Sequence, residues 1–166
     1  ARLIDDYFSN ATFFKPTGDG LLVILSYSES PLAEAAKSTI DNCFKILTDF
    51  GSFTVNDPMV NFDVPRQVGI GLSRGTACRL ESHGKTIDYS GRVLNLASRL
   101  MDFARPSGIV FDSEFGIALL SQDQIRKFQT DKVYIKSIAE RDPIDIYYSK
   151  DFTTISPISK QPIDHS

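Results

Sequence analysis

Residues 86–100 read TIDYSGRVLNLASRL, and this stretch places a carboxylate before a glycine turn and two polar side chains on the helix that follows. Asp88 stands three residues before Gly91, and Asn95 and Arg99 follow four residues apart. Side chains at positions i and i+4 lie on one face of a helix. Because an arginine guanidinium is a fixed fork of donors that suits phosphate, the stretch predicts a helix with a phosphate-facing side.

The composition indicates one globular domain. The chain has 166 residues, of which 42% are hydrophobic and 23% charged, enough to bury a sizeable core. Its net charge of −3 provides no general basic field, which argues against a nucleic-acid partner. No apolar run approaches the roughly 20 residues of a membrane span, and no signal segment opens the chain. We therefore expect no membrane association within this chain and a cytoplasmic location.

The cysteines indicate a reducing compartment. Only Cys43 and Cys78 are present, so a disulfide framework is excluded, and we expect both to be buried thiols. They do not combine with His83 and His165 at any spacing usual for a metal cluster. These features again favour the cytoplasm.

Apolar periodicity and turn residues predict alternating strands and helices. Gly51 is expected to end the first long helix, and Arg105-Pro106 to end the second. The predicted elements are a helix ending near residue 10, strands 11–15 and 21–25 joined by a turn over 16–20, a helix over 31–50, a loop over 52–65, a strand over 68–72, a helix over 92–104, a strand over 109–111, short helices over 114–120 and 122–128, and strands over 132–137 and 144–148.

The polar residues of the first hairpin have two interpretations. Asp19 lies between two glycines at the predicted tip, where Asp-Gly is a favoured turn whatever its chemistry. A carboxylate in that place would also suit a hard cation such as Mg²⁺, because glycine lets a polyphosphate approach the backbone. Lys15, taken alone, is typical of a solvated lysine at a strand end. The order of these residues along the chain carries more information than any one of them.

Five motifs occur in an order that resembles the class III nucleotidyl cyclase catalytic domain, in a divergent bacterial-type branch. The resemblance covers residues 1–148, and residues 149–166, rich in Ser, Thr, Pro and Lys, are expected to form a linker or flexible tail. The motifs are Lys15-Pro16-Thr17-Gly18-Asp19-Gly20, Val68-Gly69-Ile70, Asp88 three residues before Gly91, Asn95-Leu96-Ala97-Ser98-Arg99-Leu100, and Ala104-Arg105-Pro106-Ser107-Gly108, with a further match from Lys136-Ser137 to Pro143-Ile144-Asp145-Ile146-Tyr147.

The resemblance implies a fold and an activity. The fold is α+β with a ferredoxin-like βαββαβ core, and two copies join head to tail as a homodimer with active sites at the interface. The activity is conversion of a nucleoside triphosphate to its 3′,5′-cyclic monophosphate and pyrophosphate, with two Mg²⁺ or Mn²⁺ ions as cofactors. Metal ions would lower the pKa of the attacking 3′-hydroxyl and neutralise the triphosphate.

The resemblance also implies catalytic roles for individual residues. Asp19 matches the second of the two metal-binding aspartates of the family. Asn95 matches the residue that orients the ribose, and Arg99 the residue that stabilises charge in the transition state.

Further residues match positions that bind substrate in the family. Lys15 and Asp88 correspond to the pair that recognises the base. Arg74 stands where some members place a phosphate-binding arginine, and Lys136 is a weaker match to a lysine that binds the triphosphate.

The sequence departs from the family pattern in three places. The first strand of the family, with Phe-x-Asp and the first metal-binding aspartate, should precede the helix that ends near residue 10. We expect this strand to precede Ala1 in the full-length protein; the alternative is that this copy cannot bind both metals. The usual Gly-Asp-Thr-Val-Asn is Gly91-Arg92-Val93-Leu94-Asn95 here, and the usual His-Thr-Gly-Glu is Gly71-Leu72-Ser73-Arg74.

The departures leave the base open. A lysine donating to a ring nitrogen and a carboxylate accepting from an exocyclic amine fit adenine, and cytosine offers the same groups. Uracil also satisfies the pair, whereas guanine fits least well. We place ATP first and keep CTP or UTP as alternatives, with cyclic CMP or cyclic UMP as products in bacterial antiviral signalling. A catalytically silent regulatory or dimerisation module is a further alternative.

Overall fold

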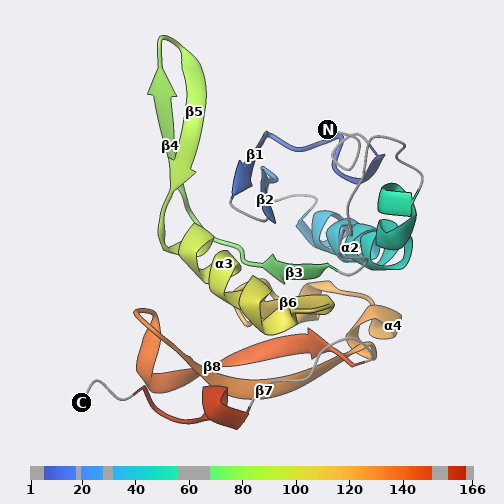
Figure 1. Ribbon diagram of the computed structural model, residues 1–166, viewed down its shortest axis with the longest axis vertical. Coiled ribbons are helices and arrows are strands. Elements are labelled where there is room, and N and C mark those ends of the chain that lie inside the picture. The colour runs from blue at the N-terminus through green and yellow to red at the C-terminus, as the bar shows by residue number, and fades with distance from the viewer. Residues whose placement is uncertain (1–5, 18–19, 28–31, 56–67, 151–156, 164–166) are drawn as a thin grey trace.

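A computed structural model describes residues 6–17, 20–27, 32–55, 68–150 and 157–163 (Figure 1). The main sheet has four strands, with β3 parallel to β6, β6 antiparallel to β8, and β8 antiparallel to β7. In spatial order these strands are β3 (Gly69–Leu72), β6 (Gly108–Asp112), β8 (Ala139–Ser149) and β7 (Phe128–Ile135). The mixed α+β class expected from the sequence is confirmed.

In the described part of the chain, two hairpins form separate two-stranded sheets outside the main sheet. The first joins β1 (Phe13–Thr17) to β2 (Gly20–Ile24), and the second joins β4 (Cys78–Ser82) to β5 (Lys85–Ser90). His83 and Gly84 connect β4 to β5 with φ values of 51° and 76°, the positive angles that a tight hairpin turn favours. The β4–β5 hairpin projects from the body of the molecule (Figure 1).

The helices lie where the sequence predicts them, but some differ in length from the prediction. Helix α3 (Arg92–Ala104) has the expected bounds. Helix α2 (Leu32–Val55) continues past Gly51, where we expected it to end, so this glycine does not act as a stop. The short helix expected over 114–120 is only the 3₁₀ turn η1 (Ile117–Leu119), because Gly116 takes a left-handed φ of 96° immediately before it. Helix α4 (Gln122–Ile125) begins with a capping box formed by Ser121 and Gln124.

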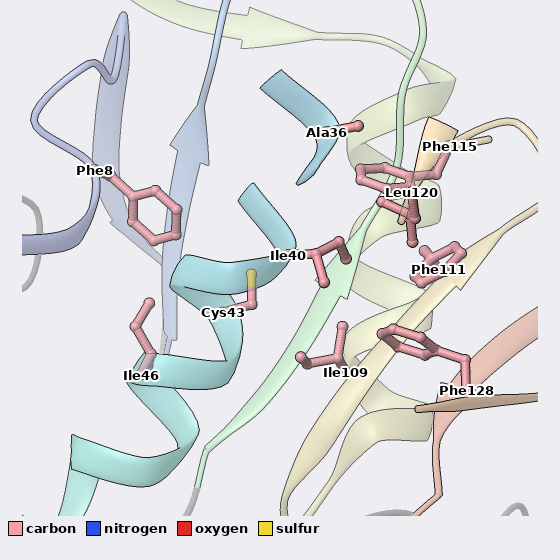
Figure 2. Packing of buried hydrophobic residues seen from close by; sticks show 10 residues of the cluster. All are labelled: Phe8, Ala36, Ile40, Cys43, Ile46, Ile109, Phe111, Phe115, Leu120 and Phe128. Carbon is pink, nitrogen blue, oxygen red and sulfur yellow. The ribbon is translucent and has the colours of Figure 1, made fainter. Parts of the chain in front are cut away.

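The core lies on both faces of the main sheet. Successive residues of a strand point to opposite faces, and in β6 Ile109 and Phe111 join the cluster under α2 while Val110 joins the cluster under α3. Figure 2 shows the first cluster, in which Ile40 and Cys43 of α2 pack in one group with Ile109 and Phe111 of β6. The strands β3 and β6 therefore run between the two helices, as Figure 1 also shows.

Helix α3 lies directly on β3 because the strand has glycine on that face. A Cβ atom at Gly71 would overlap the Ala97 carbonyl oxygen and the Met101 backbone nitrogen, and one at Gly69 would come within 3.0 Å of the Ala104 backbone. Ile70 and Leu72, which alternate with these glycines, pack on the α2 side. The alternation lets helix and strand backbones meet on one face while apolar side chains fill the other.

The two cysteines differ in burial. Cys43 is fully buried in α2, as expected, and desolvation raises the pKa of its thiol to about 12. The expectation that Cys78 is buried is wrong, since it lies on β4, where every residue is exposed. Because β4 is exposed along its whole length, no neighbouring element covers the Cys78 thiol within the described part of the chain.

The last described segment contacts the main sheet. Strand β8 ends at Ser149, one residue beyond the expected domain limit at 148, and η2 (Pro157–Lys160) follows as a turn of 3₁₀ helix. Lys160 Nζ lies 2.6 Å from Asp131 Oδ2 of β7, and this contact lowers the pKa of the Asp131 carboxyl. Among the described residues, no helix combines the length and hydropathy that crossing a membrane requires.

Two buried oxygen atoms at the ends of parallel strands have no hydrogen-bond partner within the described part of the chain. They are Ser73 Oγ, just after β3, and Asp112 Oδ1, at the end of β6. Asp112 is only 4% exposed, and burial, followed by the charge of Glu114, raises the pKa of its carboxyl, with Arg92 acting in the opposite direction. An ionised Asp112 therefore costs folding free energy.

We expect Gly71→Ala to lower the free energy of unfolding by about 3 kcal/mol, the upper range of overpacking, because α3 must move off β3. Gly75→Ala is the matched control, since a Cβ there meets Val93 at 3.4 Å, an ordinary contact distance. Urea denaturation of the two variants measures the difference. Equal stability of both would show that α3 does not depend on the close approach at Gly71.

We expect the stability of the parent chain to fall relative to Asp112→Asn as the pH rises from acid to neutral. A folded-state pKa above the ordinary carboxyl value contributes stability at low pH that is lost as pH rises through the folded pKa. Asparagine has no carboxyl proton to lose. Urea denaturation at a series of pH values should therefore show the unfolding free energy of the parent chain decreasing relative to that of Asp112→Asn as the pH rises. A difference in unfolding free energy between the parent chain and Asp112→Asn that stays constant with pH would contradict this account.

Candidate functional site

The structure brings together the two residues predicted to recognise a base. Lys15 of β1 and Asp88 of β5 are 73 positions apart in sequence, yet Lys15 Nζ donates to Asp88 Oδ1 at 2.6 Å. Both side chains are half-buried, at 36% and 34% exposure. The contact joins the two hairpins that stand outside the main sheet.

The pair leaves complementary groups available to a ligand. Asp88 Oδ1 accepts from Lys15 and from the backbone N–H of Tyr89 at 2.8 Å, and these two bonds, the lysine first, lower the pKa of the Asp88 carboxyl. The carboxyl is therefore ionised at neutral pH, and its second oxygen can accept a further bond. Because an ammonium has three N–H donors, Lys15 can also donate elsewhere. The pair thus offers a donor beside an acceptor.

Asn95 and Arg99 are both exposed, one turn apart on α3, as the helical spacing predicts. The buried face of the same helix carries Leu96, Leu100 and Ala104. Gly91 connects β5 to α3 with a φ of 144°, and only six residues separate Asp88 from Asn95. A short connection of this kind fixes the start of α3 relative to the end of β5, so the Asn95 and Arg99 face is tied to the position of Asp88.

An aromatic contact accompanies the ion pair. The rings of Phe13 and Tyr89 lie 5.4 Å apart between centroids, at an angle of 57°. An exposed ion pair contributes about 0–1 kcal/mol, whereas an aromatic pair adds roughly 0.5–1.5 kcal/mol beyond its buried area. Neither ring was predicted from the sequence to belong to the site. The available signal was that Phe13 stands two residues before Lys15 on a strand and Tyr89 follows Asp88.

Arg74 follows β3, and its side chain reaches the turn that follows β6. Its Nε donates to the Glu114 carbonyl oxygen at 3.0 Å, and a Cβ at Gly116 would lie 3.6 Å from its Nη2. The described contacts thus place Arg74 at the carboxyl end of β3 and β6, beside the chain that follows β6. Its predicted role in phosphate binding stays a prediction.

Lys136 is exposed in the turn between β7 and β8. The turn is shaped by Ser137, which has a φ of 67° and whose backbone N–H donates to Glu140 Oε1 at 2.8 Å. In Figure 1 the β7–β8 hairpin lies across α3, β3 and β6 from the β1–β2 hairpin. The described contacts do not bring Lys136 to the Lys15–Asp88 pair within one chain.

The predicted metal ligand Asp19 lies outside the described residues. Among the residues that are described, no group of three or more His, Cys, Asp or Glu side chains is placed to hold a metal ion. The site that can be built from the described side chains therefore consists of Lys15, Asp88, Asn95 and Arg99.

Comparison with known proteins supports the fold. No protein-family model matches the chain, and no curated protein matches it. The chain is similar to two solved structures of adenylate cyclases from Trypanosoma brucei in their monomeric state, each at 16% identity. One match has a TM-score of 0.53 and covers 98% of this chain and 80% of the other, and the second has a TM-score of 0.51 and covers 93% and 78%. The chain therefore has the fold of these adenylate cyclases.

Proposed function

We propose that the chain is a nucleotidyl cyclase that converts a nucleoside triphosphate, ATP first, to its 3′,5′-cyclic monophosphate and pyrophosphate. One observation carries the proposal: on a fold shared with adenylate cyclases, Lys15 and Asp88 are in contact at 2.6 Å. Asn95 and Arg99 are exposed on the helix that begins four residues after Asp88.

The Lys15–Asp88 pair suits a base edge on which an acceptor and a donor are neighbours. Adenine carries ring N1 beside its exocyclic amine, and cytosine carries ring N3 beside its own amine, so the lysine can donate and the carboxylate accept. Uracil can place O4 at the lysine and N3–H at the carboxylate. Guanine would direct O6 at a carboxylate that cannot donate. ATP is therefore the first candidate, and CTP and UTP are the alternatives.

Asn95 and Arg99 supply positioning and charge in the proposed reaction. The ribose 3′-oxygen attacks the α-phosphorus, the bond from that phosphorus to the bridging oxygen breaks, pyrophosphate leaves, and the 3′-proton passes to solvent. An amide at Asn95 can hold the ribose in line, which reduces the entropic part of the barrier. The guanidinium of Arg99 can bind the oxygens on which negative charge develops. Both act from a helix whose backbone rests on β3, so their placement is rigid.

A second copy of the chain is the proposed partner, joined head to tail so that each active site lies at the interface. Asn95 and Arg99 are exposed, so a covering surface is needed to exclude water from the reacting groups. The two hairpins also expose large apolar side chains, as expected of an interaction surface. These are Phe14 at 46%, Leu21 at 40%, Leu80 at 44% and Ile87 at 57%.

We propose Mg²⁺ or Mn²⁺ as cofactor, with Asp19 as one ligand. When bound, such ions would neutralise the triphosphate. Because Asp19 lies outside the described residues, the steps above are assigned only to side chains that the structure describes.

The direct test is to incubate the full-length protein, including any residues that precede Ala1, with each of the four nucleoside triphosphates and Mn²⁺ or Mg²⁺, and to separate the products by chromatography. We expect a 3′,5′-cyclic product and an equal amount of pyrophosphate, with ATP used best. No cyclic product from any nucleotide would contradict the enzymatic proposal and favour a catalytically silent module that binds nucleotide or a partner. A preference for CTP or UTP would assign the chain to a pyrimidine cyclase.

Arg99→Ala should lower kcat by roughly 10²–10³-fold, the usual effect of removing a group that stabilises transition-state charge. Because Arg99 is exposed, the free energy of unfolding and the sedimentation of the dimer should not change. Arg126→Ala, which removes an exposed arginine at the C-cap of α4, is the control and should retain full activity. If Arg99→Ala retained its activity, Arg99 would not be the residue that stabilises charge in the transition state.

Asp88→Ala should broaden the choice of base more than it lowers the overall rate, since it removes the acceptor that rejects guanine. The measurement is the ratio of kcat/KM among the four nucleotides. Asp145→Ala is the matched control, because Asp145 forms an exposed ion pair with Lys132 at 2.9 Å on β7 and β8. An unchanged nucleotide ranking in Asp88→Ala would show that Asp88 does not read the base.

A further inference from the structure

Two hairpins carry the base-reading pair, and neither belongs to the main sheet. The ion pair between Lys15 and Asp88 and the ring contact between Phe13 and Tyr89 connect β1 to β5 through side chains. No hydrogen-bonded ladder joins these two strands within the described part of the chain. The spacing between Lys15 and Asp88 therefore depends on what keeps the side chains of the two hairpins together.

We propose that Phe13 and Tyr89 are positioning residues whose ring contact holds the Lys15–Asp88 pair together and thereby determines which base the site accepts. The claim about base selection rests on the proposed function. Its first part, the dependence of the ion pair on the ring contact, stands on the geometry of the two hairpins.

The ring contact acts on both partners of the ion pair. Phe13 and Lys15 are half-buried and alternate with the exposed Thr12 and Phe14, so they share one face of β1. On β5, the backbone N–H of Tyr89 donates to Asp88 Oδ1 at 2.8 Å, so the residue that contributes the ring also orients the carboxylate. Fixing Phe13 against Tyr89 therefore brings Lys15 to Asp88.

The ion pair alone is a weak link. About a third of each charged side chain is exposed, so water and dissolved salt compete for both groups. The ring contact is apolar and salt does not screen it. Discrimination between bases requires a donor and an acceptor at a fixed spacing, and a loosely held pair would adapt to several base edges. The aromatic contact is the part of the link that can supply that rigidity.

The first test measures the pair without any reaction. The pKa of Asp88 is followed by NMR of the side-chain carboxyl carbon in the full chain, and Lys15→Met gives the value without the ion pair. In Phe13→Ala we expect the pKa of Asp88 to rise most of the way to the Lys15→Met value. Phe14→Ala makes the same chemical change one residue further along β1, on the opposite face, and should leave the titration unchanged.

Substitutions at Tyr89 repeat the test from the other hairpin. Tyr89→Phe keeps the ring and should titrate like the parent chain, whereas Tyr89→Leu should behave like Phe13→Ala. The backbone N–H at position 89 is present in all of these variants, so only the contribution of Lys15 to the pKa of Asp88 changes. Far-UV circular dichroism of each variant should match the parent. An Asp88 pKa that remains low in both Phe13→Ala and Tyr89→Leu would overturn the proposal.

The second test addresses base selection. Phe13→Ala and Tyr89→Leu should narrow the kcat/KM ratio between the preferred nucleotide and GTP by roughly 2- to 10-fold, the range expected for one aromatic pair. The change should appear mainly in KM, and Tyr89→Phe should restore the ratio. An unchanged ratio, with the Asp88 titration altered as expected, would overturn the role in base selection.

The two tests separate this inference from the proposed function. If the parent chain forms no cyclic product from any nucleotide, the proposed function fails and the base-selection part fails with it. The Asp88 titration then still decides whether the ring contact holds the ion pair.

Discussion

The close approach of α3 to β3 is the contact on which the rest of the structure depends. Because Gly69 and Gly71 present no side chain to the helix, backbone meets backbone, and α3 cannot rotate or shift without a clash. The helix covers one face of β3 and β6 while α2 covers the other. The exposed face of α3, with Asn95 and Arg99, is consequently fixed relative to the sheet.

The candidate site combines this rigid helix with two weakly attached hairpins. Asn95 and Arg99 belong to an element supported by the core, whereas Lys15 and Asp88 belong to hairpins that meet through side chains. Groups that stabilise charge must be placed accurately before the reaction, because reorganisation adds to the barrier. A base reader can tolerate movement while substrate enters. The fold thus gives the more rigid support to the residues assigned to chemistry.

The sequence allowed prediction of elements whose signals are local. The helix over residues 92–104 was predicted with the correct bounds, because its apolar stripe begins after Gly91 and Arg105-Pro106 follows it. The contact between Lys15 and Asp88 could be predicted only through a family resemblance, since nothing local links residues 73 positions apart. The ring contact of Phe13 with Tyr89 was missed for the same reason. The exposure of Cys78 depends on which surfaces pack over β4, which no local pattern records. A single glycine is tolerated within a helix at a modest cost, so Gly51 did not mark the end of α2.

Selectivity at this site would arise from the cost of leaving a charge without a partner rather than from the strength of the bonds made. In the single chain the Asp88 side chain is 34% exposed, so water can reach its carboxylate. A base in a covered interface would displace that water. The correct base replaces it with an N–H donor, whereas a base that presents an oxygen leaves the carboxylate desolvated and unpaired. Discrimination by this route requires both the second copy of the chain and a carboxylate that cannot turn away, and Lys15 and the backbone N–H of Tyr89 are the two groups that hold it.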